Sequence, residues 1–153
     1  MASKEQIMAT LYMLIGIPGS GKSTYSKNNK LFSNCTIINP DALRKEYFGS
    51  ESIQARNQDI FAEAHKRVLT ALYSGQDVVF DATNIRRHDR ETLISRLPDG
   101  TKTIALYFNT PLYECLRRNA ARARYVPDKV IHRMYHALEK PTCDEFDKII
   151  YCK

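Results

Sequence analysis

The chain has 153 residues, of which 43% are hydrophobic and 26% charged, enough for one domain with a single core. This ordinary composition excludes a disordered or fibrous protein. The formal net charge of +6 favours a polyanionic partner such as nucleic acid, although any nucleotide-binding enzyme also needs cations.

The amino-terminal half alternates short apolar runs with amphipathic stretches, which is typical of strands separated by helices. Apolar residues at helical spacing from Ile60 to Leu72 predict a long helix that Gly75 ends. In chain order, the predicted elements are a strand over Leu11–Ile15, a helix from Thr24 to about Lys30, a strand over Thr36–Asn39, a helix from about Ile53 to Leu72 and a strand over Asp77–Asp81.

The carboxyl-terminal half continues this alternation. Its predicted elements are a helix over His88–Leu97, a strand over Thr103–Phe108, a helix from Pro111 to about Ala121, a helix from Pro127 to about Glu139 and a strand over Lys148–Tyr151. Strands that alternate with helices predict an α/β fold, with a parallel sheet of four to five strands and helices on both faces. No long linker interrupts the chain, so residues 1–153 are expected to form a single domain.

A glycine-rich turn directly follows the first predicted strand. It consists of Gly16, Ile17, Pro18, Gly19, Ser20, Gly21, Lys22, Ser23 and Thr24. This is the spacing of a phosphate-binding loop, or P-loop, in its strand–turn–helix setting, where backbone N–H groups face the phosphates. Lys22 would add positive charge at the outer phosphates, and the Ser23 hydroxyl would bind Mg²⁺. The loop therefore predicts ATP and Mg²⁺ as cofactors.

Acidic residues follow two further predicted strands. Asp41 comes after the second strand and Asp81 ends the third, so both should converge on the phosphate site at the carboxyl edge of the sheet. Asp41 suits a general base that accepts the proton of an acceptor hydroxyl, and Arg44 would hold an anionic acceptor. The alternative is that Asp41 only caps a helix after Pro40, with Arg44 a surface cation.

The surroundings of Asp81 narrow the class of reaction. An acidic residue at the end of an apolar strand is typical of a Walker B element, which makes Asp81 a candidate Mg²⁺ ligand. Ala82 follows it instead of a water-activating glutamate, which disfavours ATP hydrolysis as the purpose. The sequence also lacks an Asn-Lys-x-Asp guanine-reading motif, which disfavours a GTPase. A kinase is the remaining option.

An arginine-rich segment provides a third candidate site. Its arginines are Arg117, Arg118, Arg122 and Arg124. Arg118 and Arg122 are four residues apart on one helix face, where we expect them to lack an acidic partner and to bind an anion. Small kinases close an arginine-bearing lid over the triphosphate, so we predict a lid over about residues 117–128. The alternative is a solvated basic face.

Together these motifs resemble the kinase domain of phage-type polynucleotide kinase. The matching segments are Gly16–Thr24, Asn39-x-Asp41-x-x-Arg44, Asp81-x-Thr83-Asn84 and Arg118-Asn119-x-x-Arg122 before Val126-Pro127. The resemblance covers about residues 11–138 in order. It implies a P-loop kinase fold and ATP- and Mg²⁺-dependent transfer of the γ-phosphate to the 5′-hydroxyl of a polynucleotide, DNA or RNA.

The resemblance also implies roles for individual residues. Lys22 and Ser23 would bind phosphates and metal, and Asp41 would act as the general base. The other implied roles are acceptor binding by Arg44 and Asn84, organisation of the acceptor or metal site by Asp81, contact of Arg122 with the transferring phosphate, and assistance from Arg118 and Arg124.

Two alternatives stay open at this point. The first is a P-loop kinase that acts on a small molecule such as a nucleoside, sugar or sugar nucleotide, because the same group of kinases includes such enzymes. The second is a non-catalytic ATP-binding module. An acceptor panel with labelled ATP would separate them.

The remaining composition bears on the location of the protein. The four cysteines form no C-x-x-C pair, which disfavours zinc. The residues Met1–Glu5 lack the apolar stretch of a signal peptide, and no apolar run approaches the roughly 18 residues that cross a bilayer. We therefore expect a soluble, intracellular, cytoplasmic protein with no membrane partner, and the oligomeric state stays open.

Overall fold

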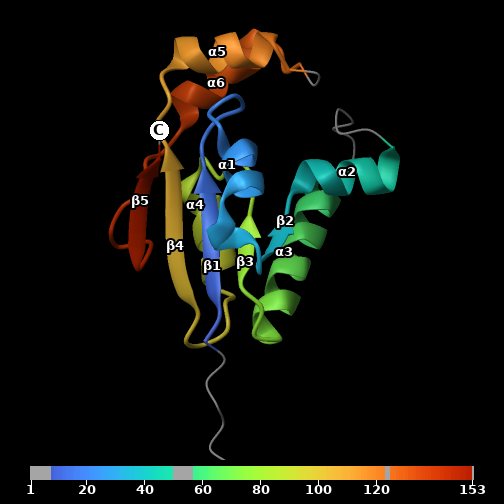
Figure 1. The fold of residues 1–153 in the computed structure, drawn as a ribbon, viewed down its shortest axis with the longest axis vertical. Helices are drawn as coiled ribbons and strands as arrows, with labels where there is room; N and C mark the ends of the chain where they lie inside the picture. Colours follow the sequence, from blue (N-terminus) through green and yellow to red (C-terminus); the bar gives the residue numbers. More distant parts are fainter. Residues whose placement is uncertain (1–7, 50–56, 123–124, 153) are drawn as a thin grey trace, which may run out of the picture.

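A computed structural model describes residues 8–49, 57–122 and 125–152. Its centre is a parallel sheet of five strands in the order β2-β3-β1-β4-β5 (Figure 1). The strands are β1 (Thr10–Ile15), β2 (Thr36–Ile38), β3 (Val78–Phe80), β4 (Lys102–Phe108) and β5 (Lys148–Cys152). The predicted α/β fold with a parallel sheet of four to five strands is confirmed.

The described residues also form six α-helices and a short 3₁₀ helix. They are α1 (Lys22–Asn28), η1 (Lys30–Phe32), α2 (Pro40–Phe48), α3 (Asn57–Tyr73), α4 (Arg87–Ile94), α5 (Leu112–Ala120) and α6 (Asp128–Ala137). The first helix begins at Lys22, two residues before the predicted Thr24, because Gly21 at φ +101° is its N-cap. The predicted long helix includes Ile53, which lies outside the described residues.

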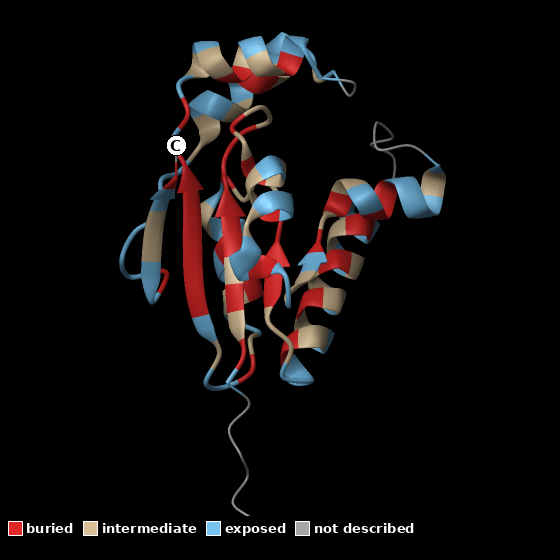
Figure 2. Cartoon of the chain, in the orientation of Figure 1, coloured by how far each residue is buried: buried red, intermediate tan, exposed pale blue. Residues whose placement is uncertain are grey.

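The core has one layer on each face of the sheet. Figure 2 shows that the central strands are largely buried. Successive residues of a strand point to opposite faces. On β4, Ala105 and Tyr107 join the layer that contains the apolar residues of α3, whereas Ile104 and Leu106 pack with Phe32 on the other face. Helices on both faces were predicted from the sequence, and this prediction is confirmed.

A third apolar cluster lies at the carboxyl ends of the strands, where α5 and α6 pack together (Figure 1). Its buried members are Ile17, Ile85, Cys115 and Ile131. Ile17 belongs to the P-loop and Ile85 follows β3, so this cluster seats α5 and α6 on the loops that carry the candidate site.

A buried ion pair fixes the turn that follows β3. Arg90 on α4 is fully buried and donates to Glu145 Oε1 at 2.8 Å and Oε2 at 3.1 Å. Its Nη1 also donates to the carbonyl oxygens of Asn84 at 2.8 Å and Glu139 at 2.9 Å. Four hydrogen bonds therefore join α4, the β3–α4 turn and the chain after α6.

Replacing Arg90 by Met is expected to lower the free energy of unfolding by about 3–5 kcal/mol, because it leaves the Glu145 carboxylate buried without its partner. Urea denaturation checks this value. The double variant Arg90→Met with Glu145→Met should recover part of the loss, since it removes the unpaired charge. A single variant as stable as the wild type would contradict the assignment.

Candidate active site

The P-loop needs glycine at positions where its backbone turns tightly. Gly19 and Gly21 have φ angles of +84° and +101°, a region that L side chains rarely adopt. A Cβ on Gly19 would also clash with the carbonyl oxygen of Cys115 on α5. The start of the loop is held to the turn that follows β3, because Gly16 N–H donates to the Thr83 carbonyl oxygen at 3.0 Å.

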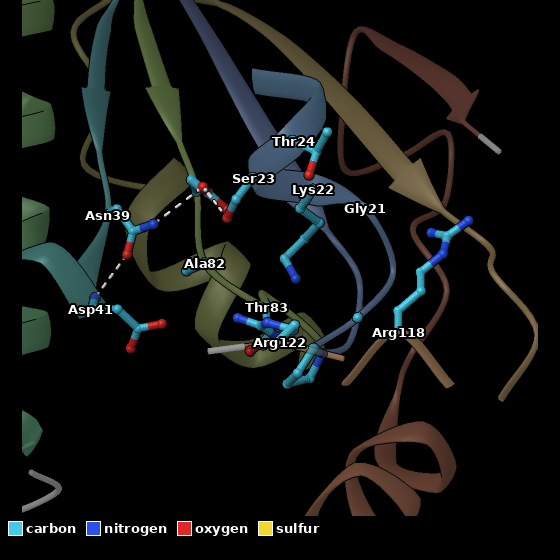
Figure 3. Close-up of a pocket in the computed structure, with 13 residues that line it drawn as sticks. Gly21, Lys22, Ser23, Thr24, Asn39, Asp41, Ala82, Thr83, Arg118 and Arg122 are labelled. Carbon is cyan, nitrogen blue, oxygen red and sulfur yellow. Dashed lines mark hydrogen bonds between the residues drawn. The ribbon is translucent and has the colours of Figure 1, made fainter. Parts of the chain in front are cut away.

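Lys22 lies in the first turn of α1 and points into the loop (Figure 3). Its ammonium group donates to the Ile17 carbonyl oxygen at 3.1 Å, and the residue is only 8% exposed. Burial lowers the pKa of Lys22 to about 8, although the Asp81 carboxylate opposes this shift. The loop thus presents a desolvated cation whose charge depends on pH near neutrality.

The affinity for ATP should therefore be nearly constant below pH 8 and fall above it. A lysine with a lowered pKa is neutral above that pKa, so ATP binding must then be accompanied by proton uptake. The affinity for ATP should therefore fall by up to about tenfold per pH unit. Calorimetric titration with ATP on either side of pH 8 checks this expectation. The variant Lys22→Met should bind ATP weakly without that break, and a break that persists in the variant would assign it to another group.

Ser23 and Asp81 meet at the edge of the same loop. Ser23 Oγ donates to Asp81 Oδ2 at 2.9 Å, and Asn39 Nδ2 donates to the same oxygen at 3.2 Å. Burial raises the pKa of Asp81, although the charge of Lys22 and the two hydrogen bonds oppose this shift. A hydroxyl and a carboxylate oxygen are hard donors of the kind that Mg²⁺ prefers beside phosphates, so this pair fits that ion.

Asp41 lies in the first turn of α2. Asn39 caps that helix, because its Oδ1 accepts from the N–H groups of Asp41 at 2.8 Å and Ala42 at 3.3 Å (Figure 3). Pro40 occupies the first helical position, where no N–H is needed. The alternative that Asp41 serves only as the helix cap is therefore wrong, and its carboxylate reaches the cavity beside the P-loop.

Arg44 is one turn further along α2 and is only 6% exposed. Its Nη1 pairs with Asp41 Oδ1 and its Nη2 donates to Asn57 Oδ1 on α3. The guanidinium carbon lies 5.7 Å from the centroid of the Phe61 ring, and Nε has no hydrogen-bond partner. The alternative that Arg44 is a surface cation is therefore wrong.

Two cavities meet at these side chains. The first, here called the loop cavity, has a volume of about 320 Å³ and is lined by the P-loop, Arg118 and Arg122. The second, the side cavity, has a volume of about 550 Å³ and lies between α2, α3 and α6. The residues that line both are Pro18, Asn39, Asp41, Asp81, Ala82 and Thr83. Asp41 and Asp81 thus converge on the P-loop, as the strand order predicted.

The arginine pair differs from the prediction in two respects. Arg118 is on α5, but the helix ends at Ala120 and Arg122 lies in the segment that follows it, so the two do not share one helix face. Glu114, one turn before Arg118, accepts from Arg118 Nε at 3.0 Å and also pairs with Arg117. The expectation that Arg118 lacks an acidic partner is therefore wrong, because Glu114 faces the same side of the helix. Arg118 and Arg122 nevertheless both line the loop cavity (Figure 3). Arg124 lies outside the described residues.

Comparison with known proteins agrees with this arrangement. The family described as "AAA domain" matches residues 11–141. The chain belongs to this family. A curated relative, L-seryl-tRNA(Sec) kinase of Methanococcus maripaludis, is 30% identical over 139 residues, which are 86% of this chain and 53% of that protein. The chain thus spans about half the length of that relative.

Solved structures of other proteins show the same fold. A chain of the Pnkp1/Rnl/Hen1 RNA repair complex matches with a TM-score of 0.76 at 22% identity, over 86% of this chain and 44% of that one. A sugar kinase from Janibacter sp. HTCC2649 matches with a TM-score of 0.72 at 17% identity, over 94% of this chain and 84% of that one. The predicted P-loop kinase fold is confirmed, and it implies ATP binding.

Most of the predicted P-loop residues line the loop cavity. Those that line it are Pro18, Gly19, Gly21, Lys22, Ser23 and Thr24. Gly16 and Ser20 lie behind them, where the Ser20 carbonyl oxygen accepts from Thr110 Oγ1 at 2.9 Å. These two residues shape the loop from within.

Asn84 is a correction. Its side chain lies away from both cavities and donates to the Leu14 carbonyl oxygen at 2.7 Å, at the end of β1. Its backbone has a positive φ of 49°, and its carbonyl oxygen accepts from Arg90. Asn84 therefore holds the β3–α4 turn in place instead of lining an acceptor site.

Several residues of the site were missed by the sequence reasoning. Asn39 and Thr83 stood in the quoted motifs, and their position after a strand end was a usable signal. Phe61, Arg133 and Met134 line the side cavity from α3 and α6, and no local pattern marked them. No helix among residues 8–49, 57–122 and 125–152 is long and apolar enough to cross a membrane.

Proposed function

We propose that this P-loop kinase transfers the γ-phosphoryl group of ATP to the 5′-hydroxyl of a polynucleotide. The observation that carries the proposal is that Asp41 lines both cavities, between the P-loop and a pocket that holds arginines. A base at that boundary is placed to accept the proton of a hydroxyl that enters from the side cavity.

The reaction follows from the positions of these groups. The acceptor oxygen forms a bond to the γ-phosphorus as its proton passes to Asp41, and the bond to the β,γ-bridging oxygen of ATP breaks. Lys22 of the P-loop and Arg122 of the segment after α5 offset the negative charge of the transferring group. Mg²⁺ held by Ser23 and Asp81 would supply further positive charge at the outer phosphates.

The lining of the side cavity supports a nucleotide acceptor. Arg44, buried beside Asp41, has an unpartnered Nε and would hold a phosphate near the attacking hydroxyl. Tyr125 is 58% exposed at the cavity wall and offers a ring for base stacking. Arg133 on α6 adds a second cation, and it forms no ion pair within the described part of the chain. Two cations suit an acceptor with more than one phosphate.

Replacing Arg133 by Ala should raise the KM for a 5′-hydroxyl oligonucleotide and reduce the salt slope of binding by about one unit, since one phosphate contact is lost. Steady-state kinetics at several salt concentrations check this. Lys102 is exposed at the amino end of β4, far from the cavities, and Lys102→Ala is the matched control. Equal salt slopes for the two variants would remove Arg133 from the acceptor path.

A small-molecule acceptor is the second candidate. The side cavity, at about 550 Å³, has the size of an ordinary small-ligand site, and one structural neighbour is a sugar kinase. A panel with γ-labelled ATP separates the candidates: 5′-hydroxyl DNA, 5′-hydroxyl RNA, nucleosides, sugars and water alone. Label on nucleosides or sugars but not on oligonucleotides would favour the small-molecule kinase. ATP binding without transfer to any acceptor would favour the non-catalytic module.

A further inference from the structure

Asn119, at the end of α5, is fully buried although its side chain is polar. Its Nδ2 donates to the Val126 carbonyl oxygen at 2.6 Å, and its Oδ1 accepts from the Val126 N–H at 3.1 Å. One amide therefore satisfies both backbone groups of a residue seven positions further along the chain. This pair of hydrogen bonds fixes the position of Val126 relative to α5.

The two ends of this contact belong to different cavities. Arg118 and Arg122 flank Asn119 in sequence and line the loop cavity. Val126 lines the side cavity, together with Val130 and Arg133 of the helix that follows. The amide is thus a direct link between the wall of the loop cavity and the wall of the side cavity.

The packing beside Asn119 connects α5 to the P-loop and to α6. Cys115, one turn earlier on α5, packs with Ile17 of the P-loop and with Ile131 of α6. The carbonyl oxygen of Cys115 also lies against Gly19. Because α5 is fixed to the P-loop in this way, the bonds from Asn119 set Val126 and α6 relative to the P-loop as well.

We propose that Asn119 is a positioning residue for phosphoryl transfer, which acts through Arg122 on the nucleotide and through Val126 on the acceptor. The inference rests on the proposed kinase function. Asn119→Ala should lower kcat about 10²-fold, which is the loss expected when a reacting group is displaced by about 1 Å. It should also raise the KM for the 5′-hydroxyl oligonucleotide.

A double-mutant cycle separates positioning from a loss of stability. If Asn119 acts on kcat through Arg122, then Asn119→Ala should have almost no further effect on kcat in the Arg122→Ala background. The increase in oligonucleotide KM should persist in that background, since it arises through Val126. The proposal would be overturned if the kcat of the double variant were reduced by the product of the two single losses. It would also be overturned if Asn119→Ala kept the wild-type kcat.

Two further variants distinguish a positioning role of Asn119 from a general loss of stability. Thr103→Val removes a buried hydroxyl that bonds to Asp147 at the amino end of β4, so it should reduce stability without changing kcat. Asn119→Gln keeps a neutral amide with both a donor and an acceptor, but its extra methylene displaces them from the Val126 backbone groups, and it should fall between Asn119→Ala and the wild type. It replaces Asn119→Ala in the cycle if the alanine variant does not fold.

Failure of the proposed acceptor would be visible separately. If the wild-type protein transfers no phosphate to the oligonucleotide, the same cycle is measured by the affinity for ATP. Asn119→Ala should then weaken ATP binding in the wild-type background and leave it unchanged in the Arg122→Ala background. An equal effect in both backgrounds would overturn the role of Asn119 even in that case.

Discussion

Replacing Arg122 by Ala is expected to lower kcat by about 10³-fold or more, which is the range for an arginine that stabilises the charge of a transferring phosphoryl group. Arg122 lines the loop cavity together with Lys22, so its positive charge lies where the outer phosphates of ATP would bind. Since this interaction strengthens in the transition state, the loss should fall on kcat more than on the KM for ATP. Single-turnover transfer of labelled phosphate measures it.

A neighbouring arginine on α5 provides a matched control. Arg117 lies five residues earlier, pairs with Glu114 and has a side chain that is 72% exposed. Arg117→Ala removes an arginine from the same cluster but not from the cavity, so it should retain nearly wild-type kcat. Arg122→Lys should recover only part of the activity, because a lysine cannot reproduce the planar donors of a guanidinium. Equal losses for Arg117→Ala and Arg122→Ala would indicate a general electrostatic effect instead.

Asp41→Ala is expected to lower kcat about 10²–10⁴-fold and to leave ATP binding nearly unchanged. The carboxylate lies at the boundary of the two cavities, where the acceptor hydroxyl would lose its proton. The P-loop does not depend on Asp41 for its hydrogen bonds to Asp81 and Ile17, so the nucleotide site should persist. Rapid-quench kinetics together with ATP titration separate the two effects.

A control on the same helix tests whether the loss of activity depends on where the removed carboxylate lies. Glu46 is on α2, and its carboxylate pairs with Arg67 of α3 at 3.2 Å on the surface. Glu46→Ala should change stability by no more than about 1 kcal/mol and leave kcat intact. An active Asp41→Ala enzyme would show that the general base has been misassigned.

The strand ends explain why much of the site was predictable. Parallel strands bring their carboxyl ends to one edge, so the residues after β1, β2 and β3 had to converge. Asp41 and Asp81 could be placed near the P-loop on that argument alone. Asn39 was also within reach of the sequence, because an Asn before Pro is a favourable helix cap, so the Asp that follows is not needed to cap the helix.

Most of the features that were missed depend on contacts between elements distant in the chain. The pairing of Glu114 with Arg118 follows from their spacing on one helix and was overlooked, whereas the bonds from Asn84 to β1 and from Arg90 to Glu145 span 70 and 55 positions. Phe61 and Arg133 reach the side cavity only through the rotation of α3 and α6 against the sheet, which tertiary packing decides.

The most direct test of the proposed reaction is transfer of label from γ-labelled ATP to a short oligonucleotide with a 5′-hydroxyl, compared with the same oligonucleotide already carrying a 5′-phosphate. We predict Mg²⁺-dependent labelling at the 5′ end of the hydroxyl form, none on the phosphorylated form, and loss of labelling with Asp41→Ala. Label that reaches only nucleosides, sugars or inorganic phosphate would contradict a polynucleotide 5′-hydroxyl kinase.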